Sequence, residues 1–499
     1  MTPRRAAAQR AAAQRAAARR AAGQRRSGTA IAFAAALATA VTATGCATFS
    51  ADGGFGPVEQ SARERLGKEV VWSRSDADRD LIAERVEALL ARPLGADEAV
   101  QVALLNHRGL QAAFQELGIA EADVVDAGRL PNPGFSFGRL TRGDEVEYER
   151  GIHFNLARLI AMPLIGPIEA RRFEQTRQRV TMTMLDHAAD TRLAFYDAVA
   201  AEEAVRFAAR IRQAADASAE LARRMAQVGN FTRLQRAREQ SFQADALLNL
   251  ARAEQARIAS RERLTRLLGL WGPQTSFRLP ERLPDLPAAP EDAPDIERTG
   301  LATRLDVQAA RLGAEQTARN LGLTRTTRFI NVLELGLVSN RSNQAPTQRG
   351  WEVAFELPLF DWSGSRVARA EAIYRQALDR AADAAITARS EIREAYGAYR
   401  SAYDIARYYR DEVVPLRNRI AEENLLRYNG MLIGVFDLLA DARAQIAGVQ
   451  GYLGALHAFW SARARLDRAL VGRPGSSADG PGTSVSAAAG TPADAGGAH

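Results

Sequence analysis

The chain has 499 residues, of which 46% are hydrophobic and 25% charged, so it is long enough for several domains. One cysteine excludes an intramolecular disulfide, and the five histidines are scattered without an i,i+4 pair, so no metal site is predicted. The net charge of +7 arises from eight arginines within residues 1–28, and the remainder sits near −1. The basic balance therefore does not indicate a nucleic-acid-binding protein.

Residues 1–46 have the pattern of a targeting segment. An arginine-rich start is followed by the apolar run 31–41, which is too short to span a bilayer because a spanning helix needs about 20 residues. The sequence Ala43-Thr44-Gly45-Cys46 follows and resembles a bacterial lipobox. We expect a covalent lipid on Cys46 and no other cofactor; the alternative is plain signal cleavage nearby.

A first repeat is predicted over residues 94–272, after a polar peripheral segment at 47–93. It opens with two helical runs that end at Gly128, the first of them with Asp97 as a possible N-cap. Two strands, at about 134–139 and 151–157, flank a polar hairpin.

A very long helix follows these strands. Between Glu169 and Val228 there is no glycine or proline, and 60 helical residues would measure about 90 Å. Helices in globular domains average about 11–12 residues, so a coiled coil is the alternative interpretation of such a stretch taken alone. A turn near Gly229 and Asn230 precedes a returning helix that reaches about Leu268.

The same order recurs after a proline-rich linker at 273–300, so we predict a second repeat at 301–472. It contains a helix, strands at about 329–338 and 351–359, and a long helix from Ser365 with a kink at Pro415. A turn spanning Asn429, Gly430 and Gly434 leads to a returning helix. Residues 473–499 are rich in Gly, Ser, Ala and Pro and are expected to be disordered.

The last strand alternates strictly between apolar and polar residues. Its large apolar side chains are Trp351, Val353, Phe355, Leu357 and Leu359. Only helices and closed barrels satisfy all backbone groups in lipid, and the smallest outer-membrane barrels have about eight strands. If this apolar face meets lipid, the four strands must be shared between chains. Glu334, Glu352 and Glu356 would then face the lumen.

The chain resembles the TolC-like outer-membrane factors, in their lipoprotein form, over about residues 95–470. The resemblance rests on the duplicated order, on Leu130-Pro131-Asn132-Pro133 before the first strand, and on the segment 358–362 after the last one. It also rests on the two helix reversals at 228–238 and 427–443.

The resemblance implies a mainly α fold with a small β part. Three chains would form one outer-membrane β-barrel, with four strands from each, continued by a long periplasmic α-helical barrel. It further implies an exit duct of a tripartite efflux system, which a periplasmic adaptor and an inner-membrane pump of a Gram-negative bacterium would serve. The helix reversals would lie at the periplasmic tip, where the duct closes and the adaptor docks.

Asp437 lies just past the second reversal, and three copies around the axis would form an acidic ring. Arg427 or Arg443 could restrain that ring through a salt bridge, as could Arg233 or Arg238 from the first reversal. The alternative is that Asp437 only caps its own helix.

Other function classes receive less support. No nucleophile triad, phosphate-binding loop or metal spacing predicts an enzyme. A periplasmic or cell-surface coiled-coil structural protein would explain the long helices but not the four alternating strands. A type I protein-secretion duct is an alternative function. The sequence does not identify the substrate, which can be metal ions, drugs or proteins.

Overall fold

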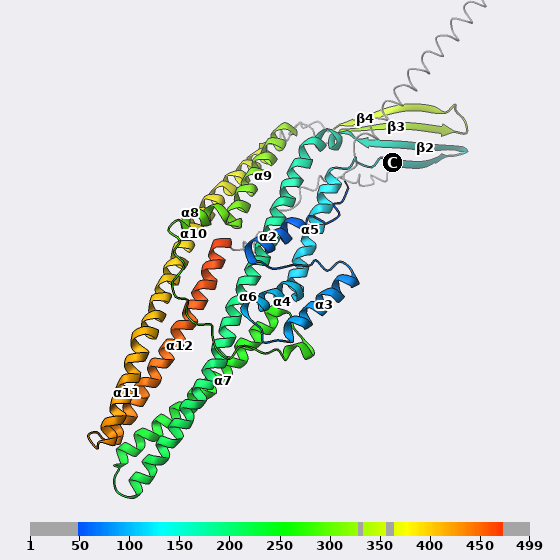
Figure 1. Ribbon diagram of the computed structural model, residues 1–499. Coiled ribbons are helices and arrows are strands. Elements are labelled where there is room, and N and C mark those ends of the chain that lie inside the picture. Colours follow the sequence, from blue (N-terminus) through cyan, green and yellow to red (C-terminus); the bar gives the residue numbers. More distant parts are fainter. Residues whose placement is uncertain (1–47, 328–332, 356–363, 473–499) are drawn as a thin grey trace, which may run out of the picture.

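The computed structural model describes residues 48–327, 333–355 and 364–472. Its described part is elongated, with a β-sheet at one end and two helical pairs that run away from it to two tips (Figure 1). The order of helix, β-hairpin and long helical pair occurs twice, so the predicted mainly α, duplicated fold is confirmed.

The elements of the first repeat follow two peripheral helices. The helices before the sheet are α2 (Gly56–Leu66), α3 (Asp76–Leu90), α4 (Ala96–Asn106) and α5 (Arg108–Ala127). Strands β1 (Gly134–Arg142) and β2 (Glu145–Asn155) precede α6 (Leu156–Gln227) and α7 (Arg233–Leu268). A short 3₁₀ turn, η1 (Gly272–Thr275), lies in the connection to the second repeat.

The second repeat contains α8 (Ile296–Thr303), α9 (Leu305–Thr327), β3 (Leu333–Ser342) and β4 (Gln348–Phe355). It continues with α10 (Gly364–Tyr408), a π-helical turn η2 (Tyr409–Val413), α11 (Val414–Asn429) and α12 (Val435–Val471). The α6–α7 and α10/α11–α12 pairs form the two long arms in Figure 1.

The four strands form one antiparallel sheet in the order β1-β2-β3-β4. The expected polar hairpin between the first two strands is wrong, because β1 and β2 stay paired until Arg142 faces Glu145. Only Gly143 and Asp144 make the turn, and Gly143 adopts a φ of +59°, which favours glycine. The polar side chains there alternate across the two faces, so they extend the strands instead of ending them.

Helix α6 starts earlier than the sequence predicted. Asn155 caps it, accepting a hydrogen bond from the Arg158 amide at 2.8 Å. Pro163 and Pro167, expected to break the chain before Glu169, lie inside the helix. Each proline removes one backbone donor within the first few turns, and the helix continues through both.

Where a kink was predicted at Pro415, the structure has a change in helix type about one turn earlier. The π-helical turn η2 separates α10 from α11, and Pro415 stands in the first turn of α11. The first amides of a new helix have no intrahelical partner, so proline, which has no amide hydrogen, is tolerated there. The π turn absorbs the change of helical register between α10 and α11.

Residues 48–93 of the predicted peripheral segment contain two helices, α2 and α3. Helix α3 starts with a capping box in which Ser75 and Asp78 exchange hydrogen bonds. Trp72 is buried and lies 5.7 Å from the ring of Phe55. Gly95, not Asp97, is the N-cap of α4.

The linker is packed against the helices rather than free. Leu283 and Leu286 are buried in the main apolar cluster, which joins α4, α6, α7, α10 and α12 around Phe459. Tyr403 donates its hydroxyl to the Ala288 carbonyl at 2.7 Å. This cluster lies between the sheet and the tips and holds the two repeats together.

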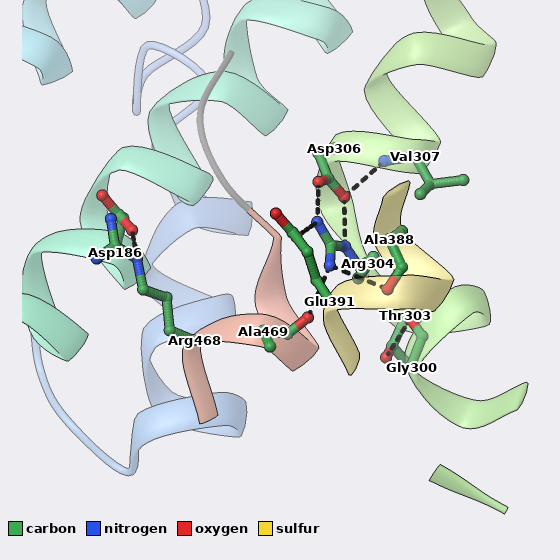
Figure 2. Close-up of polar contacts among 10 residues, drawn as sticks. All are labelled: Asp186, Gly300, Thr303, Arg304, Asp306, Val307, Ala388, Glu391, Arg468 and Ala469. Carbon is green, nitrogen blue, oxygen red and sulfur yellow. Dashed lines mark hydrogen bonds and ion pairs between the residues drawn. The ribbon is translucent and has the colours of Figure 1, made fainter. Parts of the chain in front are cut away.

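Arg304 ties helices α9, α10 and α12 together, as Figure 2 shows. The side chain is only 2% exposed and lies between α8 and α9. It donates to Asp306 at 2.9 Å, to Glu391 of α10 at 2.8 Å, and to the carbonyls of Ala388 and Ala469 at 3.4 and 3.1 Å. A buried guanidinium with all of these partners fixes the helices at a defined spacing.

Candidate functional site

The apolar side chains of the sheet gather on one face. Because β partners share a face, the register places Phe135, Ile152, Leu337 and Trp351 in one row across all four strands. Phe154, Leu335 and Val353 form the next row, and Leu333 pairs with Phe355 in a third. Trp351 is 74% exposed and Phe135 70%, so no described part of the chain covers this face. Leu357, predicted for this face, lies outside the described residues.

The opposite face carries acids and glycines. Glu334 and Glu352 share it, as predicted, while Glu356 lies outside the described residues. His153 also lies there, its Nε2 2.9 Å from the Ser136 hydroxyl. A Cβ on Gly151 would stand 2.5 Å from that hydroxyl, so glycine leaves the room that this contact needs.

The first helix reversal is built as predicted around Gly229. Its φ of +80° favours glycine, and the amide of Asn230 returns to the Met225 carbonyl at 2.9 Å. Thr232 then caps α7 in a capping box with Gln235.

The second reversal differs in detail from the prediction. Gly430 has a φ of −81°, and the left-handed residue is Met431, with a φ of 58°. Asn429 ends α11, and Gly434 is the N-cap of α12. The Asp437 carboxylate accepts a hydrogen bond from the Gly434 amide at 3.3 Å, so within this chain Asp437 caps its own helix.

The two reversals touch each other. Phe231 of the first and Phe436 of the second lie with ring centroids 4.3 Å apart. Phe231 is buried, so this contact joins the two arms at the tip.

A buried ion pair joins the arms further from the tip. Glu239 of α7 is 1% exposed, accepts a hydrogen bond from Ser218 of α6 at 2.5 Å, and pairs with Arg443 of α12 at 2.5 Å. The Arg443 guanidinium also lies 4.5 Å from the centroid of the Phe242 ring. The sequence suggested Asp437 as a partner of Arg443, but in the structure Arg443 pairs with Glu239.

The other three candidate arginines of the reversals are Arg233, Arg238 and Arg427. None of them forms an ion pair with another residue in the described part of the chain.

The Glu239 contact was missed from the sequence, although a signal exists. Glu239, Phe242, Ala246 and Leu250 follow one another at helical spacings of three and four, and Ala246 and Leu250 are buried. An acid on such an apolar stripe indicates a buried partner of opposite charge.

Two negative findings apply to the described ranges. None of the helices there carries an apolar stretch long enough to cross a bilayer. No group of three or more His, Cys, Asp or Glu side chains there is placed to hold a metal ion. The predicted lipidation residue Cys46 lies outside these ranges.

Comparison with known proteins identifies the fold. No protein-family model matches the chain. The cobalt-zinc-cadmium resistance protein CzcC of Cupriavidus metallidurans is 26% identical over 279 residues, a match that covers 54% of this chain and 64% of that protein. The matched part thus spans somewhat less than two thirds of this curated relative.

Solved structures match over more of the chain. The outer membrane protein VceC of Vibrio cholerae superposes with a TM-score of 0.63 at 15% identity, covering 76% of this chain and 96% of that one. The Campylobacter jejuni CmeC outer membrane channel gives 0.63 at 16% identity, covering 81% and 91%. CusC gives 0.61 at 15% identity, covering 78% and 92%. At these identities the matches establish the fold.

Proposed function

We propose that this chain, which has the fold of the TolC-like outer-membrane channels, is one protomer of a trimeric outer-membrane exit duct. The observation that carries the proposal is a four-stranded sheet with an uncovered apolar face that continues into helices of up to 72 residues. At 1.5 Å per residue such a helix measures about 110 Å, enough to reach far into the periplasm.

The open edges of the sheet support a shared barrel. In the described chain β1 and β4 each pair on one side only, so each leaves a row of unpaired backbone groups. Unpaired groups in lipid cost several kcal/mol each, so an isolated sheet of this kind is unsuited to a membrane. Pairing β1 of one chain with β4 of the next, three times, would close twelve strands, which lies within the known range of about 8 to 26.

The tips would then converge on the axis and form the closed end. Phe231 on Phe436 and Glu239 with Arg443 hold the two arms of each protomer together there. Opening the duct requires the arms to move apart, so these contacts are the restraints within each protomer. An adaptor protein and an inner-membrane pump are the partners that such a duct needs.

Divalent transition-metal ions are the substrate class that we propose to test first, because the curated relative is named for cobalt, zinc and cadmium resistance. A type I secretion duct is the competing proposal. Deleting the gene should sensitise cells to these metals, and the intact gene should restore growth; loss of a secreted protein with unchanged metal tolerance would favour the competitor.

The duct itself is tested on purified protein. The chain should fractionate with the outer membrane, migrate as a heat-modifiable trimer and conduct ions in planar bilayers. A soluble, non-conducting chain would refute the proposal and favour a coiled-coil structural protein.

Lipidation of Cys46 is a separate proposal, motivated by the only cysteine standing after an apolar run and Gly45. A labelled fatty acid should tag the wild type and not Cys46→Ser. Equal labelling of both would contradict it. We expect the trimer to survive the substitution, because the barrel and not one lipid anchor would hold it in the membrane.

A further inference from the structure

Four arginines lie on the same face of the sheet as its apolar rows. Phe137 pairs with Arg150, Arg150 with Ser339, and Ser339 with Arg349, which places these residues in the row next to Trp351. In the following row Arg139 pairs with Tyr148, and Tyr148 with Arg341. All four arginines are therefore gathered towards the hairpin end of the sheet, and the apolar rows lie towards the helices.

The position of these arginines sets the depth of the sheet in a membrane. An arginine on the lipid face of a barrel costs about 2–4 kcal/mol at mid-depth and about 0–1 kcal/mol near an interface. The free-energy cost of four arginines at mid-depth would be too high for a stable barrel. Arg150 and Arg349 therefore mark the membrane–water interface on the side away from the helices. The exposed aromatic side chains of Trp351 and Phe137 lie beside them, as in the aromatic girdles of such barrels.

No acid of the described chain neutralises these arginines. All four are exposed and none forms an ion pair within the described residues; Arg139 only lies over the Tyr148 ring, at 5.9 Å. The acids of the adjacent strand, Glu147 and Glu149, alternate with Tyr148 and Arg150 and so occupy the opposite face. An anion for this belt must therefore come from outside the described part of the chain.

We propose that Arg139, Arg150, Arg341 and Arg349 form a belt that binds the phosphate groups of lipids in the outer leaflet. A guanidinium can donate two parallel hydrogen bonds to a phosphate, and arginine is the residue suited to that geometry. The apolar rows one step closer to the helices contact the acyl chains of the same lipids. A phosphorylated lipid thus matches both halves of the face. The inference rests on the proposed function, because it requires the sheet to lie in the outer membrane.

The first arm of the test needs no variant. Purified trimer in an uncharged detergent is titrated with lipid A that carries both phosphates, and separately with the same lipid after its phosphates are removed. Bound lipid is counted by native mass spectrometry. The phosphorylated lipid should bind at least tenfold more tightly, with an affinity that falls as salt is added. Equal affinity for the two lipids would overturn the proposal.

The second arm compares variants on the two faces of the sheet. The double variant Arg150→Gln, Arg349→Gln removes two charges that lie in one row of the belt, on either side of Ser339. Arg142→Gln removes one charge from the same end of the sheet but from the opposite face. The double variant should lose at least tenfold in affinity for the phosphorylated lipid, and Arg142→Gln should match the wild type. Equal losses in both would assign the effect to overall charge and refute the belt.

Conductance measured on the same preparations separates the two proposals. Conducting trimers that do not distinguish the lipids would refute the belt alone. Absence of trimers and of conductance in the wild type would refute the duct, and the belt with it.

Discussion

Breaking the ion pair between Arg443 and Glu239 should loosen the closed end of the proposed duct. The substitution Arg443→Met leaves the Glu239 carboxylate buried, with the Ser218 hydroxyl as its remaining partner. Removing one partner of a fully buried pair costs about 3–5 kcal/mol. The Arg443 side chain is 34% exposed, so part of its charge is already solvated and we expect about 2–3 kcal/mol per protomer.

That cost falls on the closed arrangement if the arms separate when the duct opens. Once the arms have separated, water reaches Glu239 and the penalty disappears. A shift of about 2–3 kcal/mol per protomer changes the ratio of open to closed arms by roughly 30- to 150-fold. We therefore expect Arg443→Met to raise the mean single-channel conductance in planar bilayers and to sensitise cells to vancomycin.

Two variants near the tip provide the controls. Arg427→Met removes an arginine that has no ion pair with a described residue, and it should leave the conductance unchanged. Asp437→Asn keeps the cap on α12, since asparagine caps about as well as aspartate, so it should also be silent. If Arg443→Met conducts like Arg427→Met, the ion pair does not restrain the closed end. If Asp437→Asn raises the conductance, Asp437 acts across the axis as well as in its own helix.

Three further predictions concern the sheet, the junction of the helices and the response to acid. Phe355 lies six residues from Arg349, which is about 20 Å along the strand and about 15 Å in membrane depth at the usual barrel tilt. Phe355→Arg should therefore cost about 2–4 kcal/mol and lower the trimer yield more than Glu352→Arg, which changes the opposite face. Equal yields of the two variants would refute the assignment of the faces. Arg304→Met should destabilise the protein by about 3 kcal/mol in thermal melts at a matched scan rate, because it breaks a buried ion pair. Arg298→Met removes an 80% exposed partner of a surface pair and should cost under about 1 kcal/mol. Similar losses of stability in the two variants would show that the burial of Arg304 does not set its contribution. Burial lowers the pKa of His187 to about 4, whereas in the unfolded chain this histidine titrates near 6.5, so the unfolded chain takes up the proton first as the pH falls. The free energy of unfolding should therefore decline by about 2 kcal/mol between about pH 6.5 and pH 5. Thermal melts of His187→Gln should show a smaller decline over the same pH range.

The sequence by itself determined the elements and the faces of the strands. A period of two from Trp351 onwards predicted a strand whose apolar and acidic residues separate, and the structure places Trp351 and Glu352 on opposite faces. Sixty residues without glycine or proline predicted the core of α6, and glycine with a positive φ makes the first reversal at Gly229. These features depend on neighbours along the chain, so local patterns suffice to predict them.

Element boundaries depended on contacts that no local pattern contains. The strands extend to Arg142 and back from Glu145 because each polar residue there finds a partner across the hairpin. The peripheral segment folds because Trp72 and Phe55 can be buried against the main body, and burial against distant elements outweighs weak periodicity.

Only the tertiary structure decided which charges meet. Arg443 was expected near Asp437, six residues away in the sequence, but it pairs with Glu239, 204 residues away, because packing of α12 against the α6–α7 arm brings the two together. The four arginines of the belt come from four strands, and nothing along the chain aligns them; the register of three strand pairs does. Side-chain partners across a fold follow from how helices and strands pack, and that packing minimises the free energy of the whole chain and not of any one segment.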